Sequence, residues 1–141
     1  MRVLLDANAI LRYLLDDDAE MAARTRSALS YGAFLLPEVL AEVVYVLSGV
    51  YAVPRKELAE KTIPFLSEIQ SAQHDVLQRA LEHFGATTLD FVDCLLLAYH
   101  EICGDSVMTF DKKLNKRLAL LRTSRGSMPD LEIDIDTLRN R

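Results

Sequence analysis

The chain has 141 residues, of which 50% are hydrophobic and 26% charged. This length and composition fit a single globular domain over residues 1–141 that buries a core of its own. A net charge of −5 excludes a chain that is basic throughout, and no apolar run is long enough to span a bilayer. Charged residues also interrupt the first apolar run, so we expect no signal peptide and a cytoplasmic location.

Short apolar runs alternate with amphipathic segments along the chain. In order, they predict a strand at 3–5, helices at 9–15 and 19–30, a strand at 33–36, helices at 38–49, 55–69, 74–84 and 91–103, a strand at 106–110 and a helix at 112–121. Asp18 is placed to cap the second helix, and Pro37 and Pro54 stand where helices begin. Pro64 should kink or divide the helix that contains it. Residues 131–138 alternate with period two, a weak edge-strand pattern, and the segment after about residue 122 has no assigned role.

Strands that alternate with helices predict a parallel sheet covered by helices on both faces, a three-layer α/β/α arrangement. Ligands of such sheets bind beyond the carboxyl ends of the strands. Asp6 follows the first predicted strand directly, and Asp111 follows the third. If these two strands are neighbours, both carboxylates lie in one crevice.

Two further acids lie on predicted helices. Glu42 is flanked by apolar residues, on or beside the face that should pack inward, and Asp93 lies in the first turn of a strongly apolar helix, where the helix dipole favours its ionised form. Taken singly, each acid has a structural explanation as a turn former, helix cap or solvent-exposed residue. Gathered together, four carboxylates would need divalent cations to neutralise them. Ligation by oxygen alone points to Mg²⁺ or Mn²⁺.

Four segments resemble the acidic signatures of PIN-domain ribonucleases, most closely the VapC-type toxins of toxin–antitoxin systems. These segments are "LLDANAILRYLL", "PEVLAEVVYVLSG", "LDFVDCLLLAY" and "VMTFDKKL". The resemblance extends to about Leu121, with the four segments in the family's order. It implies a PIN-like fold and Mg²⁺- or Mn²⁺-dependent hydrolysis of RNA phosphodiester bonds.

The resemblance also implies roles for individual residues. The positions that match the family's catalytic and metal-binding acids are Asp6, Glu42, Asp93 and Asp111. Asn8 and Thr109 match small polar residues near the first and last of these acids. Asp90 is expected to cap its helix and could also reach the site as an outer acid.

A basic segment follows Asp111 directly. Between residues 112 and 128 the chain carries six basic residues and no acidic one: Lys112, Lys113, Lys116, Arg117, Arg122 and Arg125. Lysine and arginine contacts to phosphates are the usual footprint of nucleic-acid binding, so we expect Lys112, Lys113, Lys116 and Arg117 to bind RNA. The alternative is a solvated helix face with no ligand.

Two other functions remain open from the sequence. One is a PIN-like binding module without catalysis, although such a protein would be expected to lack one or more of the four acids. The other is phosphoryl transfer on an aspartate, as in haloacid-dehalogenase-like phosphatases or response-regulator receivers. Asn8 stands where the phosphatases need a second Asp, and only Asp6 is present where receivers need a pair of acids.

The toxin resemblance further implies a cognate antitoxin and a homodimer. The chain has more apolar and aromatic residues than a small core obviously needs, which is consistent with such interfaces. They are Tyr13, Leu14, Tyr45, Val46, Tyr51 and Val53. The alternative is that most of them belong to the core.

Overall fold

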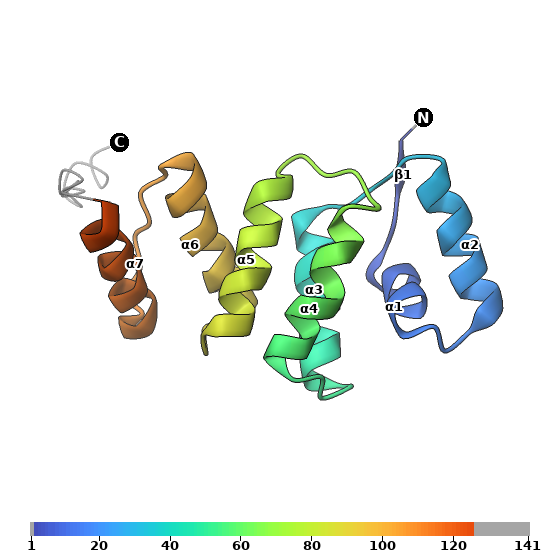
Figure 1. The fold of residues 1–141 in the computed structure, drawn as a ribbon, viewed down its shortest axis with the longest axis horizontal. Coiled ribbons are helices and arrows are strands. Elements are labelled where there is room, and N and C mark those ends of the chain that lie inside the picture. The colour runs from blue at the N-terminus through green and yellow to red at the C-terminus, as the bar shows by residue number, and fades with distance from the viewer. Residues whose placement is uncertain (1, 126–141) are drawn as a thin grey trace, which may run out of the picture.

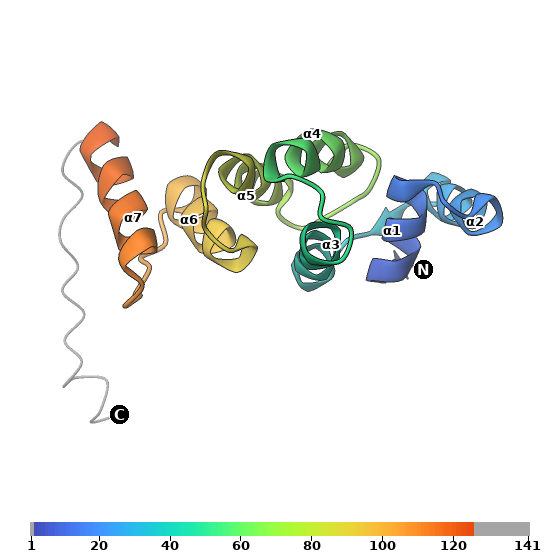
Figure 2. The same ribbon diagram turned by 90° about the horizontal axis from the view of Figure 1, so that it is seen from below.

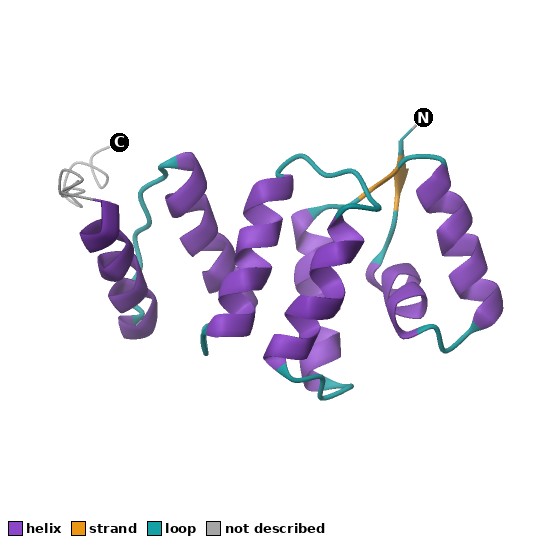
Figure 3. Cartoon of the chain, viewed as in Figure 1, coloured by secondary structure: helices purple, strands orange, loops and turns teal. Residues whose placement is uncertain are grey.

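The computed structural model describes residues 2–125, so the predicted edge strand at 131–138 lies outside the described residues. Two short strands and seven helices form this part of the chain (Figure 3). They are β1 (Val3–Leu4), α1 (Ala7–Leu15), α2 (Ala19–Ser30), β2 (Ala33–Phe34), α3 (Pro37–Gly49), α4 (Arg55–Leu66), α5 (His74–Ala86), α6 (Phe91–Cys103) and α7 (Lys112–Arg125).

The helices form where the sequence predicts them. The Asp18 side chain accepts a hydrogen bond from the Met21 N–H at 3.0 Å, and Pro37 occupies the first turn of α3. Two details differ. Pro64 does not divide α4, which ends two residues later, and α5 continues past Gly85 to Ala86. Within residues 2–125 no helix combines the length and apolar character needed to cross a membrane.

The sheet is smaller than the sequence predicts. β1 and β2 pair in parallel, with Val3 opposite Ala33 and Leu4 opposite Phe34. Phe34 also forms a parallel bridge with Gln70, so β2 is the central strand and β1 is an edge. The described residues therefore contain an α/β unit with a parallel sheet, without a complete three-layer arrangement.

The predicted strand at 106–110 is not formed, which corrects the expectation that it lies beside β1. These residues run as an extended connection between α6 and α7 (Figure 3). A strand needs a neighbouring strand edge to satisfy its backbone, and none lies beside this segment in the described part of the chain. Met108 is 50% exposed and Phe110 86% exposed, so the apolar character that predicts a buried strand is here left in solvent.

The helices stand in an elongated row, with α1, α2 and the two strands at one end and α7 at the other (Figures 1 and 2). In both views α3, α4 and α5 separate α1 from α6. The buried side chains nevertheless form one continuous core, which runs from Leu5 beside β1 to Leu114 and Leu118 on α7.

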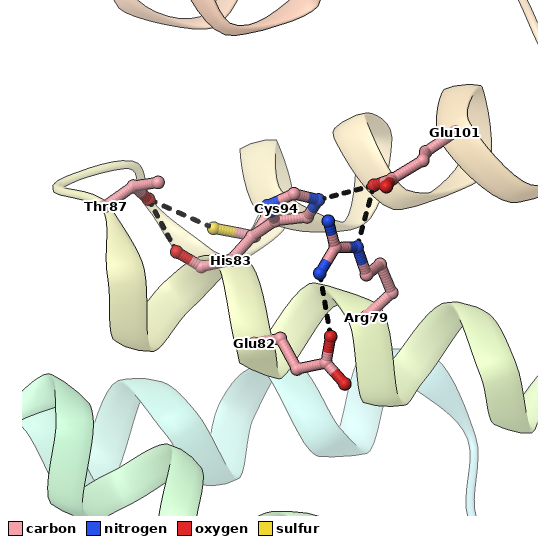
Figure 4. Close-up of polar contacts among 6 residues, drawn as sticks. All are labelled: Arg79, Glu82, His83, Thr87, Cys94 and Glu101. Atoms are coloured by element: carbon pink, nitrogen blue, oxygen red, sulfur yellow. Dashed lines mark hydrogen bonds and ion pairs between the residues drawn. The ribbon is translucent and has the colours of Figure 1, made fainter. Parts of the chain in front are cut away.

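A polar network joins α5 to α6 (Figure 4). A single oxygen of Glu101 accepts hydrogen bonds from Arg79 Nε at 2.9 Å and from His83 Nε2 at 2.8 Å. Desolvation tends to raise the pKa of Glu101, but the hydrogen bonds from Arg79 and His83 outweigh it and lower the pKa. Desolvation lowers the pKa of His83, so the neutral ring donates from Nε2 to the ionised carboxylate. The network thus fixes α6 against α5.

This network should make stability depend on pH. Because the folded pKa of His83 lies below its ordinary value of 6.5, the unfolded chain takes up a proton first as the pH falls below 6.5. The free energy of unfolding should therefore decrease on acidification below that value. The free energy of unfolding of the His83→Gln variant, measured by urea unfolding, should decrease less between pH 7.5 and pH 5.5 than that of the parent protein. Parallel curves for the variant and the parent protein would contradict this role for His83.

Candidate active site

Three of the predicted acids come together at the α6–α7 end of the molecule. Asp90 precedes α6, Asp93 lies in its first turn and Asp111 precedes α7. They line a surface groove of about 410 Å³. Its lining is Thr88, Leu89, Asp90, Asp93, Phe110, Asp111, Lys112 and Lys113. The packing of α6 against α7 therefore creates an acidic pocket bordered by lysines.

The surroundings of Asp93 in this groove shift its pKa. Desolvation raises the pKa of its carboxyl above the ordinary value, and the negative charges of Asp111 and Asp90 raise it further. The sequence predicts the opposite, because the helix dipole alone would favour the ionised form. Burial and the neighbouring acids outweigh the dipole, so a cation or a proton is favoured at this position.

Asp111 has a structural role as well. Its Oδ1 accepts a hydrogen bond from the Leu114 N–H at 2.8 Å, which caps α7. The hydroxyl of Thr109 accepts a hydrogen bond from the Asp111 N–H at 3.1 Å, and the Thr109 carbonyl accepts one from Asn115 at 2.8 Å. Thr109 therefore orients Asp111, and the second carboxylate oxygen of Asp111 accepts no hydrogen bond from the described residues.

Asp90 differs from its predicted role. It occupies the position before α6, but its side chain makes no capping hydrogen bond. Its carboxylate is exposed and lines the same groove as Asp93 and Asp111. Because its carboxylate makes no capping hydrogen bond, Asp90 is a stronger candidate for the acidic site than its sequence position alone indicates.

Asp6 and Asn8 lie at the other end of the molecule. Asp6 follows β1 and caps α1 by accepting a hydrogen bond from the Ala9 N–H at 2.9 Å. It lines a separate hollow of about 430 Å³ together with Asn8, Arg12 and Arg24. Because α1 and α7 stand at opposite ends of the row (Figure 1), one chain in this arrangement does not bring Asp6 to Asp111.

Glu42 lies on α3 with its side chain exposed, so it is not on the inward face. Its neighbours Ala41 and Tyr45 line a largely apolar hollow of about 650 Å³ that also reaches Asp90 and Asp93. α3, which carries Glu42, therefore borders the acidic groove, whereas α1, which follows Asp6, does not.

The chemistry of these acids suits a hard divalent cation, but their positions in the described chain do not form a metal site. Oxygen ligands suit Mg²⁺ and Mn²⁺, and the repulsion among Asp90, Asp93 and Asp111 favours a cation. Within residues 2–125, however, no three His, Cys, Asp or Glu side chains are close enough to hold a metal ion. In this arrangement the acids that the sequence patterns single out are separated along the row of helices.

The predicted RNA-binding residues continue the acidic groove. Lys113 lines it and also lines an adjoining hollow of about 410 Å³ that contains Lys116, Arg117 and Thr88. Lys112, Lys113, Lys116 and Arg117 are all exposed on α7. The side chains of Arg122 and Arg125 lie outside the described set. The described basic residues thus form a positive border to the acids.

A family model described as a PIN domain matches residues 3–119. The chain belongs to the PIN-domain family. The match covers all four acids that the sequence patterns single out. No curated protein and no solved structure matched the chain in the corresponding searches. PIN domains are generally nuclease domains with an α/β fold. The predicted family is therefore confirmed, and the family supports nuclease activity as the general class.

One residue of this PIN domain that the sequence patterns missed is Arg55, the first residue of α4. Its Nη1 donates hydrogen bonds to the carbonyl oxygens of Phe84 at 3.3 Å, Thr87 at 3.0 Å and Leu89 at 2.7 Å. Its guanidinium also lies 4.1 Å from the centre of the Phe84 ring. Arg55 therefore holds the turn that precedes Asp90 and Asp93. The sequence around Arg55 does not indicate this contact, because an arginine after a proline is typical of an ordinary first helical turn.

Replacing Arg55 by Met should destabilise the fold. The carbonyl oxygens of the turn lose a charged donor, which corresponds to about 2–3 kcal/mol in the free energy of unfolding. Urea unfolding measures this loss, and Lys56→Met serves as the control because Lys56 is exposed on the same turn. An equal effect of the two substitutions would exclude a specific role for Arg55.

Proposed function

We propose that this protein is a Mg²⁺- or Mn²⁺-dependent endoribonuclease that acts as the toxin of a toxin–antitoxin pair. The observation that carries the proposal is the PIN-domain match, together with acids at all four of the family's acidic positions. The basic residues that border the acidic groove support an RNA substrate. A non-catalytic binding module would be expected to have lost acids.

In this proposal Asp6, Glu42, Asp93 and Asp111 would hold a metal ion, although the described chain keeps Asp6 apart from Asp93 and Asp111. A bound ion would lower the pKa of a water molecule and supply positive charge to the scissile phosphate. Asp90, Asn8 and Thr109 support the acids, Thr109 through its hydrogen bond to Asp111. Lys112, Lys113, Lys116 and Arg117, all on α7, would bind the RNA backbone beside the acids.

The cognate antitoxin needs a surface of its own. The apolar hollow between α3 and the start of α6 is a candidate, because Tyr45 is 76% exposed, Val50 71% and Val92 57%. Exposed apolar surface of this kind is typical of protein interfaces. Of the other residues expected at interfaces, Tyr51 is exposed, whereas Tyr13, Leu14, Val46 and Val53 pack partly buried against the core.

The proposed activity should appear only with metal. We expect cleavage of a structured RNA in millimolar Mg²⁺ or Mn²⁺, no cleavage in EDTA, and a higher melting temperature with Mn²⁺ because the ion binds the folded state. Asp6→Asn should remove most of the thermal gain and keep the α1 cap, since Asn caps helices well. RNA binding without cleavage at any metal concentration would favour the binding module, and no response to Mn²⁺ would exclude the metal site.

A further inference from the structure

An exposed phenylalanine lies in the acidic groove. The Phe110 side chain is 86% exposed, and it lines the groove together with Asp93 and Asp111. Within residues 2–125 its ring makes no aromatic or cation–π contact with another side chain. Most of the surface of this ring is therefore available to a ligand that lies beside the acids.

The backbone on both sides of Phe110 is held in place. The hydroxyl of Thr109 accepts a hydrogen bond from the Asp111 N–H at 3.1 Å, and the Thr109 carbonyl accepts one from Asn115 at 2.8 Å. Asp111 in turn accepts a hydrogen bond from the Leu114 N–H at 2.8 Å, which joins this segment to α7. The ring thus stands on an anchored backbone with few side-chain torsions of its own, which lowers the entropic cost of a contact.

Positive charge leads from α7 into the same groove. The acidic groove and the hollow beside it share Leu89 and Lys113 among their lining residues, so the two adjoin. Lys116 and Arg117 line the hollow, and α7 carries no acidic residue. A polyanion whose backbone follows these cations therefore reaches Phe110.

The surroundings of Phe110 favour a nucleotide over an apolar protein segment. A protein interface is expected to extend apolar surface around an exposed ring. In this groove, however, most of the other lining residues are charged, namely Asp90, Asp93, Asp111, Lys112 and Lys113. An isolated aromatic ring among charged groups matches a nucleotide, which has an apolar base face beside a charged phosphate.

This combination distinguishes unpaired from paired nucleic acid. Proteins that hold single strands combine cations along the backbone with aromatic side chains on which bases stack. A base inside a duplex is covered on both faces by its neighbours, whereas an unpaired base can be splayed out onto a ring. Every base has such a face, so stacking selects the unpaired state with little preference for sequence.

We propose that Phe110 is a specificity-determining residue that stacks on an unpaired base beside the acids, so that the protein selects single-stranded RNA at this position. The inference rests on the proposed function for the RNA substrate. It assigns the choice between paired and unpaired RNA to an uncharged side chain, whereas Lys113 and Lys116 supply the charge that holds the backbone.

Binding of short RNAs in EDTA tests the stack without cleavage. Phe110→Leu should weaken binding of a single-stranded RNA by about 10-fold, the loss expected for one base–aromatic contact. Binding of the same RNA annealed to its complement should not change, nor should the salt slope, because no charge is removed. Phe110→Trp should retain the affinity. Tyr31→Leu is the matched control, because Tyr31 is 81% exposed at the end of α2 and lines neither hollow.

A double-mutant cycle identifies the base. One base at a time is removed from the single-stranded RNA, leaving the sugar and phosphate in place. At one position the removal should weaken binding to the parent protein by about 10-fold and leave binding to Phe110→Leu unchanged, because the partner of the ring is then already absent. The melting temperature of Phe110→Leu should equal that of the parent protein, since the ring is exposed.

The outcomes separate the stack from the nuclease function. Equal losses of Phe110→Leu on single-stranded and duplex RNA would overturn the stack, and unchanged binding of both would overturn it in favour of a protein partner for the ring. A selective loss on single strands, in a protein that cleaves no RNA with any metal, would keep the stack and reject the nuclease function. Metal-dependent cleavage together with unchanged RNA binding in Phe110→Leu would keep the nuclease function and reject the stack.

Discussion

Replacing Asp93 by Asn is expected to lower the rate of metal-dependent RNA cleavage by at least about a hundredfold, more than the loss of an outer-shell partner produces. Desolvation raises the pKa of Asp93 most, and the negative charges of Asp111 and Asp90 raise it further. Asn keeps the shape of the side chain but removes the charge that a cation needs. The free energy of unfolding in metal-free buffer should stay constant or rise, because a repulsion is relieved.

The comparison with Asp90→Asn makes this result specific. Asp90 makes no capping bond, so its substitution leaves α6 intact and tests only its contribution to the groove. If Asp90 acts as an outer acid, Asp90→Asn should lower the cleavage rate by about 10-fold to 100-fold, a smaller loss than Asp93→Asn causes. The measurement is the single-turnover cleavage rate with EDTA as the blank. A larger loss at Asp90 than at Asp93 would mean that Asp90 is the inner ligand, and equal full activity in both variants would place the site elsewhere.

Replacing both Lys113 and Lys116 by Gln should weaken RNA binding strongly while changing the chemical step little. Both residues line the hollow beside the acids, and Lys113 also lines the acidic groove. Each lost phosphate contact should reduce the slope of log K against log salt by about 0.7 for single-stranded RNA. At 50 mM salt the two losses together should raise the dissociation constant by roughly 10-fold to 100-fold.

A matched pair of lysines on another helix controls for net charge. Lys56 and Lys61 are exposed on α4, so replacing both by Gln removes the same total charge. RNA binding is measured by fluorescence anisotropy across a salt series, and the rate under saturating RNA is measured separately. If both double variants change the salt slope equally, the effect is a general one of net charge, and α7 is a solvated helix face.

The amino-acid sequence by itself determines the local structure of this protein. The Asp18 cap and the proline at the start of α3 set helix ends through contacts within a few residues, so they can be read from neighbouring letters. The apolar spacing of α3 likewise predicts its buried face, where Val43 and Leu47 are fully enclosed. The sequence also predicts the family's acidic positions, because each lies in a short motif, and this assignment stays a prediction.

Tertiary structure decided what depends on distant parts of the chain. The segment Ser106–Phe110 has the composition of a strand, but a strand forms only where a neighbouring edge is available, and α6 packs on α5 away from β1. The raised pKa of Asp93 has the same origin: the dipole of its own helix is a local effect, whereas burial and the charges of Asp111 and Asp90 come from packing. Arg55 acts on a turn about thirty residues away, which no local pattern indicates. Local propensities act within a turn or two of backbone, while these outcomes depend on burial and charge summed over contacts between distant residues, and so only the folded arrangement fixed them.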